Sequence, residues 1–278
     1  MPYFGSKYID KISVIECQRW LNKLAAEYPT SFKETKARAS RVLDYAIKLG
    51  MLTRNPFKLV TMPKTQKKER PENFYTKEEL RRFLEQAKKE SYQKYAIFRL
   101  LAFSGMRKGE LLALNWGDID FSAGTVSINK TLSRDASGKA CINDTPKTSS
   151  STRIVTLDAE TMAVLGEWRR RQLNNVIYLG TSKDNLVFPN QVTGRHYNQV
   201  SFNQWSKNIA KLAGVKAITP HGFRHTHASL CFAAGLSMQD VKERLGHSSI
   251  TMTMDIYTHI TQKQSRAGAE KLARFAGF

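Results

Sequence analysis

The chain has 278 residues, 41% of them hydrophobic, which is enough for a hydrophobic core in one large domain or two ordinary ones and excludes global disorder. No apolar run approaches the eighteen or so residues of a membrane span, the N-terminus lacks a signal-peptide pattern, and the three cysteines are scattered, so we expect a cytoplasmic protein without disulfides. Lys and Arg outnumber Asp and Glu by 44 to 24, and the net charge of +20 favours nucleic acid as the partner over a merely basic soluble protein.

Residues 1–62 are predicted to form a small helical unit. Apolar residues at helical intervals predict a first helix within residues 9–28, and a second runs from about Ser31 to Leu49, with Gly50 at its end. Basic residues outnumber acidic ones by 11 to 5 in this unit. Residues 63–75, PKTQKKERPENFY, are polar, basic and interrupted by prolines, which is typical of a linker between domains.

A second domain is predicted over residues 76–278. Thr76 and Glu79 have the spacing of a capping box, and another helix follows at about 92–104. The segments TVSINKTL, KACINDT and TRIVTL are short and rich in β-branched residues, which predicts a three-stranded antiparallel sheet. The pattern is helical again from Asp158 onward. We therefore predict a fold that is mainly α with one small antiparallel β-sheet.

The segment TPHGFRHTHASL, residues 219–230, contains three of the six histidines of the chain. Thr219 suits an N-cap and proline the first helical position, which predicts a helix over about 220–234. On that helix His221, Arg224 and His225 share an arc of roughly 100°. His227 falls on the apolar stripe and is expected to be a core residue.

Two kinds of site compete for this segment. His221 and His225 have the i, i+4 spacing that zinc sites use, but no Glu lies between them and the neighbouring guanidinium would repel a cation. An arginine beside a histidine near a helix N-terminus instead favours an anion. We expect an anion site and no metal.

Three further segments carry candidate residues for a phosphate site. In SGMRKGELLAL, Arg107 precedes or begins a helix, with Glu110 placed to orient it. In TPKTSSSTRIV, Lys147 lies in a tight loop between strands, and in LGHSSITMTMDIYTHI, His247 precedes Tyr257 by ten residues. Taken singly, each has a structural explanation: an ion pair, a solvated lysine, a helix cap and a packed tyrosine.

Together, in this order and context, the four segments resemble the tyrosine recombinase (phage integrase) family, and in particular the integrases of temperate phages and integrative mobile elements. HGFRHTHASL and LGHSSITMTMDIYTH are similar to the H-x-x-R and LGH…Y signatures of that family. The resemblance covers nearly the whole chain. It implies a helical core-binding domain at 1–62, a basic linker at 63–75, and a catalytic domain at 76–278 that ends in a tail over 258–278.

The resemblance also implies a role for each matched residue. Arg107 and Arg224 would clamp the scissile phosphate, Tyr257 would attack it, and Lys147 would protonate the departing 5′ oxygen. The two matched histidines would be hydrogen-bonding and acid–base partners. The full catalytic set is Arg107, Lys147, His221, Arg224, His247 and Tyr257, with Glu110 and His225 in support.

The implied reaction cleaves and rejoins double-stranded DNA through a 3′-phosphotyrosine, with no metal, ATP or other cofactor, to integrate or excise a mobile element. The implied partners are DNA attachment sites, further copies of the chain in a tetramer on DNA, and accessory directionality or host DNA-bending factors. The tail would dock within its own protomer or on a neighbour. Candidate DNA contacts are Lys33, Lys36, Arg38, Arg41, Lys64, Lys67, Lys68 and Arg70.

Three alternatives remain open on the sequence. A type IB topoisomerase-like enzyme would share the chemistry but reseal without exchanging partners, and a non-catalytic DNA-binding regulator would share only the fold. A metal-dependent nuclease is the third. Many integrases of the family begin with a domain for arm-type DNA sites; this sequence opens almost directly on the core-binding helices, so arm-site binding, and whether such a domain was removed, stay open on the sequence.

Overall fold

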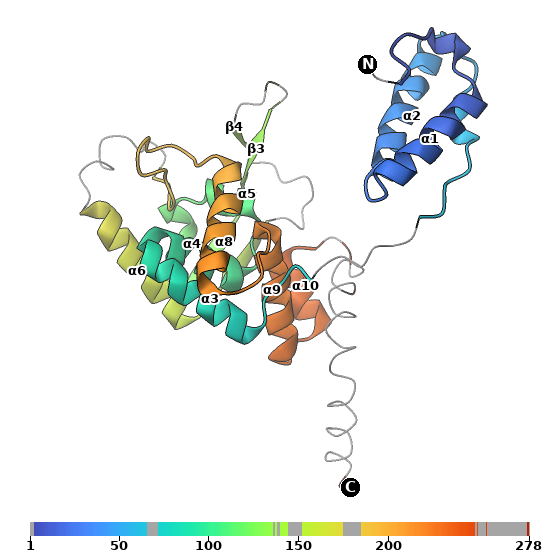
Figure 1. The fold of residues 1–278 in the computed structure, drawn as a ribbon. Helices are drawn as coiled ribbons and strands as arrows, with labels where there is room; N and C mark the ends of the chain where they lie inside the picture. Colours follow the sequence, from blue (N-terminus) through green and yellow to red (C-terminus); the bar gives the residue numbers. More distant parts are fainter. Residues whose placement is uncertain are drawn as a thin grey trace. The chain divides into compact units, whose positions relative to one another are not determined.

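The computed structural model describes residues 3–65, 72–135, 137, 140–143, 152–174, 185–247, 249, 254 and 277. The chain divides into two compact units, Met1–Pro71 and Glu72–Phe278, and each is considered by itself (Figure 1). In the described part of the chain, no helix is both long and apolar enough to cross a membrane.

The first unit packs two antiparallel helices, α1 (Val14–Glu27) and α2 (Phe32–Lys48), with two short 3-10 helices, η1 (Ile9–Lys11) and η2 (Pro56–Lys58). Helix α1 begins later than the apolar spacing predicts, because Ser13 and Glu16 form a capping box that starts the helix at Val14. Cys17 of α1 packs with Leu43 of α2 and with Phe57, which η2 adds to the core.

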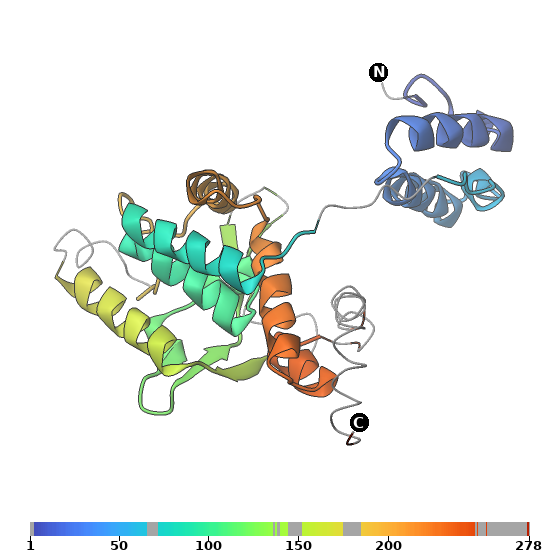
Figure 2. The same cartoon turned by 60° about the horizontal axis from the view of Figure 1, so that its bottom comes forward.

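The second unit is built around helix α4 (Tyr92–Ser104), which is buried along most of its length. Helices α3 (Lys77–Glu90), α6 (Ala159–Leu173) and α9 (Pro220–Ala233) pack directly against it. Helix α8 (Gln199–Ala213) lies against α3, and α10 (Met238–Leu245) lies beside α9 (Figure 2). The short helix α5 (Lys108–Ala113) leads through the 3-10 helix η3 (Trp116–Asp118) into the strands. The predicted class, mainly α with a small antiparallel β-sheet, is confirmed in its helical content and its antiparallel strands.

The strands form two sheets, so the prediction of one three-stranded sheet from those segments is wrong. One sheet has the order β1 (Ile119–Asp120), β2 (Thr125–Ile128) and β5 (Arg153–Thr156); the other is the hairpin β3 (Thr131–Arg134) and β4 (Ala140–Asn143). The segment TVSINKTL thus breaks at residues 129–130 into β2 and β3. Strand β3 leaves the sheet to pack on α5, so closely that a Cβ on Gly109 would lie 2.5 Å from the Thr131 hydroxyl.

Residues 73–75, which the sequence assigns to the linker, make contacts within the second unit. The Asn73 side chain accepts a hydrogen bond from the Thr219 backbone N–H (2.9 Å), and the Tyr75 N–H donates to the Thr226 hydroxyl (2.9 Å). A Cβ on Gly222 would lie 2.7 Å from the Asn73 carbonyl oxygen, so this glycine permits the close approach. The chain entering the second unit is therefore joined to the first turns of α9.

Candidate active site

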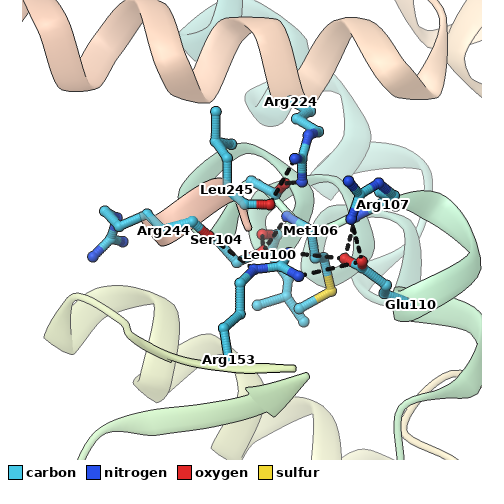
Figure 3. A network of polar contacts seen from close by, with 10 residues as sticks. Leu100, Ser104, Met106, Arg107, Glu110, Arg153, Arg224, Arg244 and Leu245 are labelled. Atoms are coloured by element: carbon cyan, nitrogen blue, oxygen red, sulfur yellow. Dashed lines mark hydrogen bonds and ion pairs between the residues drawn. The ribbon is translucent and has the colours of Figure 1, made fainter. Parts of the chain in front are cut away.

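Arg107 lies at the turn between α4 and α5, where the sequence predicts it. Gly105 ends α4 with a left-handed backbone (φ 66°), and Arg107 is the N-cap of α5. The Glu110 carboxylate accepts the Arg107 backbone N–H (2.7 Å) and its Nη1 (2.8 Å), as Figure 3 shows. Glu110 thus holds both the main chain and the side chain of Arg107, and 38% of the Arg107 side chain remains exposed.

Arg224 enters the site from the second turn of α9. Thr219 caps this helix by accepting the Gly222 N–H, and Pro220 occupies its first position, as predicted. Arg224 is only 2% exposed. Its Nη1 donates to the Gly105 carbonyl (2.8 Å) and its Nη2 to the Leu245 carbonyl (2.6 Å), so it joins the end of α4 to the end of α10 (Figure 3).

His247 follows directly after α10. Ser237 and Asp240 cap the start of that helix, and Gly246 ends it with a left-handed backbone (φ 63°). His247 is buried. Burial, followed by the charges of Arg224 and Arg107, lowers the pKa of His247 to about 3. The imidazole is therefore neutral at neutral pH and lies in the electrostatic field of both arginines.

His221 and His225 lie next to each other on α9, with ring centroids 4.7 Å apart in an edge-to-face arrangement. Burial, the neighbouring His225 and then Arg224 and Arg107 lower the pKa of His221 to about 4. Burial and Arg224 also lower the pKa of His225. An anion bound beside Arg224 would counter these effects, because it favours the protonated form of a nearby histidine.

His227 is a core residue, as its place on the apolar stripe predicts. Its Nδ1–H donates to the Ala102 carbonyl (2.8 Å), and its Nε2 accepts the Arg244 Nε–H (3.4 Å). Of the three histidines, His227 therefore belongs to the core, whereas His221 and His225 lie next to each other near Arg224. In the described residues no three His, Cys, Asp or Glu side chains are grouped as metal ligands.

Stability should fall in acid because of His227. Burial lowers the pKa of His227 to about 4, against 6.5 for the unperturbed group, so the unfolded chain binds more protons between these values. The free energy of unfolding therefore decreases as pH falls from 6.5 to 4, by up to about 3 kcal/mol from this group. Urea denaturation at pH 7 and pH 4.5 measures this. The His227→Asn variant, whose amide nitrogen replaces Nδ1 as the donor to Ala102, should lose less stability between the two pH values than the wild type; an equal loss would contradict the assignment.

Two residues at this site were missed by the sequence analysis. The Arg153 guanidinium donates to Glu110 (2.8 Å) and to the Arg244 carbonyl (2.9 Å). The Arg244 side chain in turn donates to the Thr156 carbonyl (3.1 Å). In the sequence, Arg153 is marked only by its position at the start of a segment rich in β-branched residues. That position indicates a buried arginine only once the burial of the strand is known.

Several predicted site residues lie outside the described part of the chain. These are Lys147, Tyr257, the tail 258–278 apart from residue 277, and the linker residues Lys67, Lys68 and Arg70. Lys33, Lys36, Arg38 and Arg41 lie on α2, where all but the half-buried Lys36 are exposed, and Lys64 is exposed after it. Their contacts with DNA remain predictions.

Two guanidiniums and two neutral histidines come together from the start of α5, from α9 and from the end of α10. Fixed guanidiniums bind phosphate oxygens, and neutral imidazoles can accept or donate protons beside them. A mainly helical domain that carries such a site, on a chain with a charge of +20, defines an enzyme that acts on the phosphodiester backbone of DNA.

The sequence matches the Phage integrase family over residues 73–264 and the phage integrase N-terminal SAM-like domain over residues 1–25. The chain belongs to the phage integrase family, which confirms the resemblance and the predicted enzyme class, a site-specific recombinase of the tyrosine type.

Known proteins resemble the chain over most of its length. A tyrosine recombinase XerC-like protein of Caldanaerobacter subterraneus subsp. tengcongensis is 31% identical, over 97% of this chain and 72% of its own length. The ICEBs1 integrase of Bacillus subtilis is 30% identical, over 84% of this chain and 62% of its own length. The Tn1549 transposon integrase, solved in complex with a circular intermediate DNA, has the same fold, with a TM-score of 0.77 and 24% identity over 97% of this chain and 88% of its own.

Proposed function

We propose that this recombinase integrates or excises a mobile element by cutting and rejoining double-stranded DNA at attachment sites. The observation that carries the proposal is the joint placement of Arg107 and Arg224 beside two neutral histidines. The mobile elements named for the relatives, ICEBs1 and Tn1549, support the assignment to an element.

The two arginines would bind the scissile phosphate. Attack on a phosphodiester concentrates negative charge on the nonbridging oxygens, and guanidiniums held in place before the reaction stabilise that charge without reorganisation. Arg224 is held by two backbone carbonyls and Arg107 by Glu110, so neither needs to be ordered by the substrate. Their cationic groups would do what a divalent ion does in other nucleases.

Tyr257 would be the nucleophile, and Lys147 the acid for the leaving group. A phenol has a reference pKa near 10, so the attack needs a proton acceptor, and the neutral His221 or His247 can serve. The Tyr257 oxygen forms a bond to phosphorus while the bond to the 5′ oxygen breaks and that oxygen takes a proton from Lys147. The 3′-phosphotyrosine keeps the bond energy, so a 5′-hydroxyl from another strand can reverse the step without ATP.

The two units would act together on the duplex. Residues 1–62 and the basic linker would contact the DNA backbone and some bases, with Lys33, Lys36, Arg38 and Arg41 as candidate contacts. Exchange of strands would need a tetramer on two sites, with the tail 258–278 docking in its own protomer or in a neighbour. Accessory directionality or host DNA-bending factors would set the outcome. We place the reaction in the cytoplasm of a bacterial cell, where the chromosome and the element DNA lie.

A nicked suicide duplex tests the proposal. The probe is a pool of nicked duplexes with a randomised central region, from which a covalent adduct with the full chain is isolated and its DNA sequenced. We expect an adduct that forms equally well in EDTA and yields a consensus sequence, here called the consensus duplex. No adduct at all would refute the enzyme. An adduct that is lost in EDTA would support the metal-dependent nuclease instead. An adduct that forms without a consensus sequence, and without strand exchange between two sites, would favour a topoisomerase-like enzyme.

A further inference from the structure

The first two residues of β5 are buried and exposed in the reverse of the order that hydrophobicity favours. Arg153 is buried, with only 6% of its side chain exposed, whereas the next residue, Ile154, is 72% exposed. A buried guanidinium is costly unless it is paired and hydrogen-bonded. A guanidinium that is turned inward at this position must therefore have its charge and its hydrogen-bond donors paired within the protein.

Arg153 shares the carboxylate that holds Arg107. Its Nη2 and Nη1 donate to the two oxygens of Glu110, at 2.8 Å and 3.3 Å. Burial alone would raise the pKa of Glu110, but the hydrogen bonds and charge of Arg153, followed by the hydrogen bonds of Arg107, lower it below its usual value. The orientation of Glu110, and through it that of Arg107, thus depends on Arg153.

Arg153 also reaches the other side of the site. Its Nε donates to the Arg244 carbonyl (2.9 Å) in the last turn of α10, and the Arg244 side chain donates back to the Thr156 carbonyl of β5 (3.1 Å). The next carbonyl of α10, that of Leu245, accepts Arg224. Gly246 and His247 follow at once, and the His247 backbone N–H donates to the Lys242 carbonyl of α10 (3.1 Å), so the position of His247 is set by the same turn.

We propose that Arg153 is a positioning residue of the recombination reaction: its buried guanidinium fixes Glu110, and hence Arg107, relative to the turn of α10 that places Arg224 and His247. The proposal rests on the proposed function. Arg153 acts through these neighbours and not on the DNA itself, because its side chain is buried. Its Nε–H donates to the Arg244 carbonyl and its Nη2 to the Glu110 carboxylate. A planar fork can serve a carboxylate and a carbonyl at once, whereas a lysine offers one point charge.

The test uses the full chain and the consensus duplex. We expect Arg153→Lys to slow single-turnover cleavage by about tenfold or more, since a displacement of catalytic groups by about 1 Å can cost a hundredfold. The Kd for the uncleaved duplex should stay within about threefold, because the Arg153 side chain is buried and phosphate contacts are made by exposed groups. Folding of each variant is checked by circular dichroism and urea denaturation.

Arg99→Lys is the matched control. Arg99 is equally buried, with 8% of its side chain exposed, and pairs with Asp158 (3.0 Å) and Glu160 (3.0 Å) where α4 meets α6. Its loss should lower the free energy of unfolding while the folded protein cleaves at the wild-type rate. A rate loss from Arg153→Lys that Arg99→Lys reproduces would mean a general structural role and would overturn the proposal.

A double-mutant cycle tests the route through Glu110. In a Glu110→Gln background, Arg153→Lys should slow cleavage much less than it does in the wild type, because the shared carboxylate is already gone. Fully additive rate losses would overturn the proposal.

If Arg153→Lys does not fold, the Glu110→Gln variant tests the network by itself. It should cleave slowly with an unchanged Kd, and cleavage at the wild-type rate would refute the network. A wild-type chain that forms no adduct refutes the proposed function and this role together; an adduct formed equally fast by Arg153→Lys refutes only this role.

Discussion

The Tyr257→Phe variant is expected to form no covalent adduct with the consensus duplex. Phenylalanine keeps the ring and loses only the hydroxyl that would attack phosphorus, so the rate of adduct formation should fall by at least about a thousandfold. The DNA affinity should remain, because the positive charge of the chain is unchanged. Denaturing gel electrophoresis of the suicide reaction measures the adduct.

Other tyrosines provide the control for this variant. Tyr75 and Tyr197 are held within the second unit, where burial raises the pKa of each phenol. Tyr197 donates a hydrogen bond to Gln93 (2.8 Å) and packs edge-to-face on Trp205. Tyr197→Phe should form the adduct at the wild-type rate. An adduct that persists in Tyr257→Phe would assign the nucleophile to another residue.

The Arg224→Ala variant is expected to lose both activity and stability. Removal of one preorganised donor to a transition-state oxygen costs about a hundredfold to a thousandfold in rate. In addition, two buried carbonyls, of Gly105 and Leu245, lose their hydrogen bonds. Relief of the repulsion from Arg107 and Arg153 offsets part of this cost, so we expect the free energy of unfolding to fall by about 2 kcal/mol.

Arg107→Ala separates the two effects. Its side chain is 38% exposed, and Glu110 retains Arg153 as a partner when Arg107 is removed. Arg107→Ala should therefore slow cleavage to a similar degree, with a much smaller change in the free energy of unfolding. Single-turnover cleavage and urea denaturation of both variants measure the two quantities. Equal losses of stability would contradict the different burial of the two arginines.

Local patterns in the sequence predict the helices of the site well. Thr219 and Pro220 are short-range signals, and α9 begins where they indicate and ends within one residue of the predicted boundary. The same holds for Arg107, whose place before α5 follows from the glycine turn and from Glu110 three residues later. These signals act within one helical turn, so a single sequence is enough to interpret them.

The strands show where such patterns fail. TVSINKTL has the composition of one strand, yet it divides because β3 packs on α5 rather than continuing beside β5. Likewise TRIVTL does not reveal that Arg153 faces inward and Ile154 outward. Strand pairing and facing depend on partners distant in the chain, which no local window contains.

The sequence by itself determined the class of protein, the helix that carries Arg224 and the residue types that a phosphate site needs. Only the tertiary structure decided how those residues are held. Arg224 joins the ends of α4 and α10, and Glu110 is shared by Arg107 and Arg153. His227 lies in the core, apart from the other two histidines of α9. The physical reason is that a buried charge must satisfy its hydrogen bonds, and its acceptors here are carbonyls and a carboxylate from segments tens to more than a hundred residues away.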